Sequence, residues 1–161
     1  MRTATPQDAP ACAAIYAPYV ERTVVTFEVD PPTPAEFADR IAAVVDDYGW
    51  LVAERDGDVV GYAYAHSFGE RAAYAWACET SVYVGWDERG HGAGRALYAG
   101  LLAGLEDRGY RRALAAIAMP NEASVRLHRA FGFQEAGLHR RVGWKHGAWH
   151  DVAWFQRDLQ P

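Results

Sequence analysis

Cysteine is scarce in this chain of 161 residues, which contains only Cys12 and Cys78. The two are far apart and show no metal-like spacing, so the sequence predicts buried, reduced thiols, as in a cytosolic protein. No apolar run approaches the roughly 20 residues of a membrane span. The opening residues, MRTATPQDAP, lack the apolar stretch of a signal peptide. We therefore expect a soluble, cytoplasmic protein with no membrane partner.

Runs of Lys or Arg are also absent, and the net charge is −5. This argues against nucleic acid as the main partner, although an acidic average still permits a local basic pocket for an anionic ligand. Hydrophobic residues make up 50% of the chain and charged residues 23%, a composition that excludes disorder. At this length we expect one domain, residues 1–161, with a single core.

Apolar periodicity and turn signals predict a mixed α/β protein rather than a strictly alternating one. Asp56-Gly57-Asp58 between two apolar runs predicts a hairpin, and Thr33 with Glu36 resembles a capping box at a helix start. The predicted order is helices over 6–20 and 33–48, strands over 50–54, 59–64 and 80–84, a helix ending at Gly109, a strand over 113–118, a helix from Pro120-Asn121 to about Gly132, and a strand over 151–156.

The segment Arg89-Gly-His-Gly-Ala-Gly-Arg95 places three glycines at alternate positions between a strand and a helix. Glycine permits positive φ and close approach to the backbone. The spacing is not the dinucleotide fingerprint G-x-G-x-x-G, and no Gly-Lys-Ser/Thr of a Walker loop follows. Two interpretations remain: a turn eased by glycine, or an anion site made of backbone N–H groups and the helix dipole. A phosphate group is the favoured ligand.

In the next predicted helix, Asn121, Ser124 and His128 are spaced i, i+3 and i+7, so they share one face. From spacing alone this face is either a polar surface stripe or part of a binding site. For His128 the two alternatives are a core histidine bonded to a backbone carbonyl and a group that transfers protons.

Arg89-Gly-His-Gly92-Ala-Gly94 resembles the Arg-x-x-Gly-x-Gly pyrophosphate signature of the GCN5-related N-acetyltransferase (GNAT) family, and the order of elements resembles that fold. One branch, the phosphinothricin and methionine sulfoximine/sulfone N-acetyltransferases, is similar over nearly the whole chain. The stretches that carry this likeness are Thr23-Val-Val-Thr-Phe27, Tyr48-Gly-Trp-Leu-Val-Ala-Glu54, Glu79-Thr-Ser-Val-Tyr-Val84, Pro120-Asn with Ser124-Val-Arg-Leu-His128, and Lys145-His-Gly-Ala-Trp-His-Asp-Val152.

The resemblance implies an α/β fold of the α+β type, with a mixed central sheet that splays at the cofactor-binding strand and helices on both faces. It implies acetyl-CoA as cosubstrate, held by Val82, Tyr83, Val84, Arg89, Gly90, His91, Gly92, Ala93, Gly94, Arg95, Asn121 and Ser124. No metal is expected: His146 and His150 are four apart, but Gly147 lies between them and no partnering site occurs elsewhere.

Acyl transfer to an amine requires a neutral nucleophile, so some group must take the proton of the ammonium. Glu79 is the only charged residue between Ala72 and Gly85, and a lone carboxylate there is costly unless it is paired or functional. The alternatives are a salt bridge, for example to Arg71, and a general base. The resemblance implies that Glu79 is the base, acting through water, and that His128 transfers a proton as acid or base.

A guanidinium fits a carboxylate or phosphinate in a two-pronged geometry, which favours Arg71 as a substrate residue over a surface arginine. The resemblance implies an acceptor site made of Phe27, Arg71, Ala72, Ala73, Tyr74 and Trp149. The expected reaction acetylates the amino group of phosphinothricin, methionine sulfoximine, methionine sulfone or a similar small amine. In Phe68-Gly-Glu-Arg71 the chain departs from the branch, which has Trp and a small residue there, and this bears on substrate preference.

Two other functions remain open at this point. One is a CoA-binding regulatory module without turnover. The presence of Glu79 and His128 argues against it, because a protein that only binds CoA needs neither. The other keeps the enzyme but changes the acceptor to a polyamine, an aminoglycoside or a protein N-terminus. The resemblance also implies a homodimer. The aromatic C-terminal region offers apolar area either for that interface or for the internal core: Trp144, Trp149, Trp154 and Phe155.

Overall fold

The structure is a computed structural model that describes residues 1–159, so the last two positions of the expected 1–161 domain lie outside the described residues. A mixed seven-stranded sheet runs in the order β1-β2-β3-β4-β5-β7-β6, and β4 with β5 is its parallel pair. The strands are β1 Arg2–Thr3, β2 Trp50–Arg55, β3 Asp58–Ser67, β4 Ala77–Val84, β5 Arg112–Met119, β6 Gln134–Lys145 and β7 Ala148–Asp158. The α-helices are α1 Ala9–Arg22, α2 Pro34–Val44, α3 Ala93–Asp107 and α4 Glu122–Ala130.

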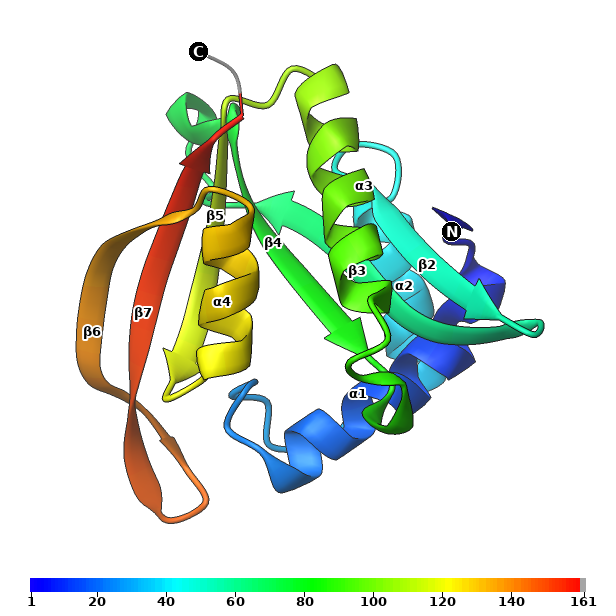
Figure 1. The fold of residues 1–161 in the computed structure, drawn as a ribbon, viewed down its shortest axis with the longest axis horizontal. Helices are drawn as coiled ribbons and strands as arrows, with labels where there is room; N and C mark the ends of the chain where they lie inside the picture. The colour runs from blue at the N-terminus through cyan, green and yellow to red at the C-terminus, as the bar shows by residue number, and fades with distance from the viewer. Residues whose placement is uncertain (160–161) are drawn as a thin grey trace.

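Helices cover both faces of the sheet, because strand residues alternate between two apolar clusters. On β3, Ala63 and Ala65 pack with the leucines of α3, whereas Tyr62 packs with Tyr16 of α1 and Phe37 of α2. Figure 1 shows α3 and α4 in front of the strands and α1 and α2 behind them. The expected α+β architecture with helices on both faces is therefore confirmed.

The sheet splits where β4 meets β5. Only residues 77–79 of β4 pair with residues 112–114 of β5, although both strands continue for five more residues. Figure 1 shows the two strands starting together and diverging toward the end of the molecule where α1 lies. We call the diverging segments, residues 80–84 and 115–119, the fork. The predicted splay at the cofactor-binding strand is confirmed.

Local signals located most of the elements. The hairpin between β2 and β3 turns at Asp56 and Gly57, both with positive φ, and Thr33 and Glu36 form the capping box of α2. Three short 3₁₀ helices, Pro6–Asp8, Ala72–Tyr74 and Trp86–Glu88, were not anticipated. The first of them replaces the start of the helix predicted over 6–20, and α2 ends at Val44 rather than near residue 48.

The sequence pattern did not predict two strands, the two-residue β1 and the much longer β6. Nearly all of the side chains of β6 are exposed, so the apolar alternation that marks a half-buried strand is missing. Within residues 1–159, β6 is an edge strand paired only with β7, and its register shifts at two places. The pairing partner β7 is correspondingly longer than the predicted 151–156 strand.

Both cysteines are buried and free, as the sequence predicts. Within residues 1–159, no helix has the length and apolar character needed to cross a membrane.

Candidate active site

The glycine loop, residues 89–95, leads from the end of β4 into α3. Gly90 and Gly92 both have φ of 86°, a conformation that side chains with a Cβ rarely adopt. Gly92 is the N-cap of α3 and has no side chain to accept a hydrogen bond from the first turn. The N–H groups that open α3 therefore have no acceptor within their own helix, and together with the helix dipole they form an anion site.

A groove of about 350 Å³ lies over this helix start, between β4 and α4. Ten of the twelve residues predicted to hold acetyl-CoA line it: Val82, Val84, Arg89, Gly90, Gly92, Ala93, Gly94, Arg95, Asn121 and Ser124. Added Cβ atoms at Gly90 and Gly92 would meet no protein atom within 4 Å, so the space above the loop is open to a ligand. The groove thus combines open amides with two guanidinium groups.

Two of the predicted residues take other positions. The Tyr83 ring faces the opposite side of the sheet, where it packs edge-on to Tyr16 and Tyr19 at 4.9 and 5.3 Å. Only its backbone is available to the fork. His91 is exposed and does not line the groove. Conversely, Tyr19 lines the groove without having been predicted, and its hydroxyl donates to the Val84 carbonyl at 2.7 Å.

Thr80 sits at the point where the fork opens. It is buried, and its hydroxyl donates to the Leu114 carbonyl at 3.0 Å and lies 2.7 Å from the Tyr98 hydroxyl. Beyond Thr80, the edge of β4 that faces β5 has no strand partner in the described part of the chain. A narrow cavity enters the fork there, lined by residues 80–83, 115–118, Val25 and the polar face of α4. An extended ligand could add hydrogen bonds along this edge.

The polar face predicted on α4 exists. The Asn121 side-chain carbonyl accepts from the Ser124 backbone N–H at 3.1 Å and caps the helix, leaving its amide NH₂ for other partners. His128 is 4% exposed, and its Nδ1 lies 2.8 Å from the Ser124 carbonyl. Nδ1 therefore carries the proton, and the buried Nε2, which has no partner among the described residues, is left with a lone pair.

This geometry matches the core-histidine alternative, since His128 is bonded to a backbone carbonyl and enclosed by rings. Tyr98 and Phe133 lie edge-on to the imidazole at 5.0 and 5.2 Å. Burial lowers the pKa of His128, and the Ser124 hydrogen bond only partly opposes this effect. His128 is thus neutral at pH 7, but it also lines the cavity in the fork.

Glu79 lies on β4 one residue before Thr80. Burial raises the pKa of its carboxyl group, and the nearby charge of His66 opposes that shift. The strand register places His66 of β3 directly opposite Glu79, a position in which Cβ atoms are about 5 Å apart. Within residues 1–159 no salt bridge involves Glu79, so the salt-bridge alternative, for example with Arg71, is not found. His66 is the neighbour that sequence reasoning missed, because only the register reveals it.

The residues predicted for the acceptor come from three separate segments. Arg71, Ala72, Ala73 and Tyr74 are exposed on the loop between β3 and β4, where Tyr74 packs edge-on to Phe68 at 5.4 Å. The Arg71 guanidinium bonds to no other residue within 1–159. Trp149 is exposed at the start of β7 and contacts Trp144, while Phe27 lies beside His150.

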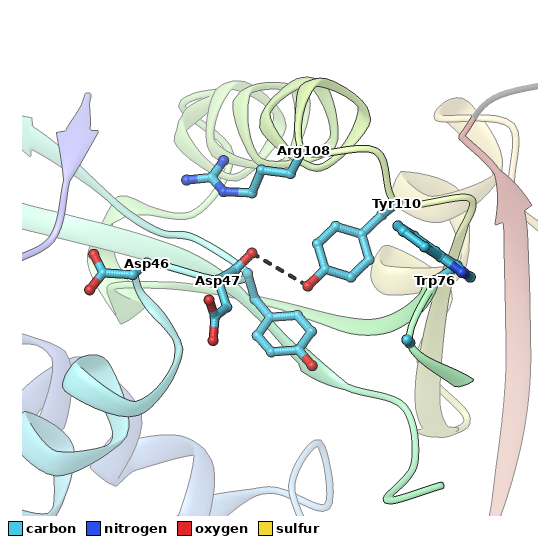
Figure 2. Close-up of a pocket in the computed structure, with 7 residues that line it drawn as sticks. Asp46, Asp47, Trp76, Arg108 and Tyr110 are labelled. Atoms are coloured by element: carbon cyan, nitrogen blue, oxygen red, sulfur yellow. Dashed lines mark hydrogen bonds between the residues drawn. The ribbon is translucent and has the colours of Figure 1, made fainter. Parts of the chain in front are cut away.

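A larger depression, about 430 Å³, lies at the other end of α3 and contains none of the predicted residues. Figure 2 shows its wall of Trp76 and Tyr110, with Asp46, Asp47 and Arg108 around the rim. Its only marked hydrogen bond joins the Tyr110 hydroxyl to the Asp47 carbonyl at 3.4 Å. The 15 residues of α3 place it about 22 Å from the glycine loop. It is therefore separate from the groove.

Enzymes that transfer a group from a nucleotide-bearing donor need what this fold provides, namely a site for phosphates and an open strand edge beside it. The chain is an acyltransferase of this kind. It belongs to the GNAT acetyltransferases, since the family described as "Acetyltransferase (GNAT) domain" matches residues 1–154.

Known relatives are similar over the whole chain. A phosphinothricin N-acetyltransferase of Streptomyces viridochromogenes is 42% identical over 99% of this chain and 87% of its own length. An L-methionine sulfoximine/L-methionine sulfone acetyltransferase of Pseudomonas paraeruginosa is 34% identical over 100% and 95%. The crystal structure of a phosphinothricin acetyltransferase from Sinorhizobium meliloti in complex with acetyl-CoA superposes with a TM-score of 0.94, at 39% identity over 98% and 86% of the two chains.

Proposed function

We propose that the protein transfers the acetyl group of acetyl-CoA to the amino group of a small amino-acid-like acceptor of the phosphinothricin, methionine sulfoximine or methionine sulfone type. The observation that carries this proposal is the fork. It connects the groove over the glycine loop with the strand that bears Glu79, a half-buried carboxylate that makes no salt bridge within residues 1–159. The names of the relatives described above support the class of acceptor.

The residues of the groove fit the phosphates of acetyl-CoA. The open amides of the first turn of α3 face the groove, and Arg89 and Arg95 add positive charge. The Arg89 guanidinium is held 3.4 Å above the Trp86 ring, which fixes its position. Once bound, acetyl-CoA supplies an activated thioester, and the open edge of β4 supplies backbone groups for its arm.

Glu79 is proposed as the general base. Transfer forms a C–N bond, breaks a C–S bond and releases a proton from the amine, and that proton goes to Glu79 directly or through water. Burial brings the pKa of Glu79 closer to neutral pH, which suits a base that must release its proton again between turnovers. The partner of the acceptor's carboxylate or phosphinate is the Arg71 guanidinium, with Ala72, Ala73, Tyr74, Phe27 and Trp149 as the surrounding wall.

His128 is proposed as a hydrogen-bond acceptor rather than as an acid. Its Nδ1 proton is committed to the Ser124 carbonyl, and burial disfavours the imidazolium. The free Nε2 lone pair can take a proton from a group bound in the fork cavity. In this proposal His128 acts as a base.

A cytoplasmic homodimer is also proposed. The two free, buried thiols suit a reducing compartment. The β6–β7 hairpin exposes apolar side chains on both strands: Leu138, Val142, Trp144 and Trp149. Grouped apolar surface of this kind marks interaction sites.

The deciding experiment measures CoA thiol release with methionine sulfone, methionine sulfoximine, phosphinothricin, a polyamine and an aminoglycoside. We expect acetylation of the first three and little release with the cationic amines, because Arg71 repels them and attracts an anionic group. Acetyl-CoA binding without turnover of any amine would identify a regulatory module instead.

A further inference from the structure

Residues 23–30, the first part of the segment between α1 and α2, cross the open end of the fork (Figure 1). We call this part the strap. It contains no helix or strand, yet Val25 lines both the groove and the cavity in the fork. The position of the strap therefore affects the shape of the proposed site.

Two side chains hold the strap to the helices beside it. The Tyr16 hydroxyl of α1 lies 2.5 Å from the Thr26 hydroxyl, and Arg40 of α2 donates two hydrogen bonds to Glu28, at 2.8 and 3.0 Å. These contacts tie the middle of the strap to α1 and α2, and a third contact reaches it from the β6–β7 hairpin.

Lys145 makes this third contact. It is the only lysine of the chain, it lies at the end of β6, and it is 4% exposed. Its ammonium donates to the Thr26 carbonyl at 2.8 Å, across 119 residues of sequence. A buried ammonium is costly unless it is well partnered. A buried cation bonded to an irregular segment indicates that the position of this segment matters.

Gly143, two residues earlier on β6, makes room for the strap. A Cβ added there would overlap the Phe27 ring, at three of its carbon atoms. The Phe27 ring occupies the space that a side chain at position 143 would fill. Phe27 is 36% exposed, and its ring lies beside that of His150. Lys145 and Gly143 act on adjacent strap residues by unrelated means, one by a hydrogen bond and one by space.

We propose that Lys145 and Gly143 are positioning residues for the amine acceptor, which latch the strap to β6 and hold Phe27 at the mouth of the site. This inference rests on the proposed function, which places Phe27 in the acceptor wall. The glycine loop leads into α3, and Val25 is the one residue of the strap that lines the groove over it. Loosening the latch therefore weakens acceptor binding more than acetyl-CoA binding.

Three variants test the latch. Lys145→Met keeps the stem and removes the ammonium, and Gly143→Ala leaves the ammonium in place but displaces the ring. Gly137→Ala is the control on the same strand, since a Cβ there meets no atom within 4 Å. We expect faster amide hydrogen exchange in residues 23–30 and an acceptor KM raised about tenfold for the first two, with acetyl-CoA Kd within about twofold. Gly137→Ala should change none of these quantities.

A double-mutant cycle identifies the route of the effect. If Gly143→Ala acts through the Phe27 ring, it should have no further effect on acceptor KM in a Phe27→Ala background. An unchanged acceptor KM in Gly143→Ala, or unchanged exchange in the strap, overturns the latch. If Lys145→Met does not fold, the Gly143→Ala arm still decides. A wild-type enzyme that acetylates none of the amines overturns the proposed function instead. Amide hydrogen exchange in residues 23–30 needs no substrate, so it still tests whether Lys145 and Gly143 hold the strap.

Discussion

Replacing Glu79 by Gln separates catalysis from structure in this site. The amide keeps the shape and most of the hydrogen bonding of the carboxyl group but cannot accept the proton of the amine. General-base catalysis contributes typically ~10²–10⁴-fold, or about 3–5 kcal/mol of barrier, so turnover should fall by that order. Acetyl-CoA affinity should stay near wild type, because Glu79 does not line the groove over the glycine loop. Higher pH should partly restore turnover by supplying more free amine.

The effect on stability has the opposite sign from that of a broken salt bridge. Burial raises the folded-state pKa of Glu79 above its usual value, which favours the protonated form. The stability that such a group contributes is complete below its unfolded-state pKa and is lost as pH rises through the folded-state pKa. Near pH 8 the ionised carboxylate therefore opposes folding. Glu79→Gln should leave the melting temperature equal or higher at that pH.

Thiol release, calorimetric titration of acetyl-CoA and melting temperature should be measured on one preparation from pH 6 to 9. Glu135→Gln is the matched control, an exposed glutamate on a strand of the same sheet, and should behave as wild type. A folded Glu79→Gln protein with near-normal turnover at pH 7 would refute the role of Glu79 as base. A lower melting temperature near pH 8 would refute the account of its burial.

Three further predictions concern the cofactor, the base and the assembly. Gly92→Ala should weaken acetyl-CoA binding, measured by calorimetry. Gly109→Ala is the control at the other end of α3, because Gly109 has nearly the same φ and equally open space, and it should only lower stability. Equal acetyl-CoA affinities of the two variants would contradict the phosphate site. His66→Phe removes the charge that lowers the pKa of Glu79, so the acid limb of the plot of kcat/KM against pH should move to higher pH. If this limb does not move, a group other than Glu79 controls it. Light scattering at micromolar concentration should give a dimer, and a mass near 17.8 kDa would rule it out.

Signals that act over a few residues predicted much of this molecule. The Asp56-Gly57 turn, the capping box at Thr33 and the glycine loop each depend on local backbone geometry, which neighbouring residue types specify. Their positions agree with the structure because tertiary packing does not change the local backbone conformation at these residues.

The features that were missed depend on pairing between distant segments. His66 meets Glu79 only through the register of β3 and β4, and Phe27 meets Gly143 across more than a hundred residues. The direction of the Tyr83 ring follows from the alternation of β4 once its faces are known, not from the motif that contains it. A solvent-exposed edge strand such as β6 leaves no apolar pattern to read.

The burial of Lys145 has a chemical consequence for a protein that handles a reactive thioester. Uncatalysed acetylation of proteins requires an accessible, unprotonated amine. Apart from Lys145 and the histidines, the basic side chains of the chain are arginines, whose guanidinium groups are too weakly nucleophilic. The single ε-amine of the chain is enclosed and already donates to Thr26. The enzyme can therefore be saturated with its own acetyl donor without losing the charge of its lysine side chain to self-modification.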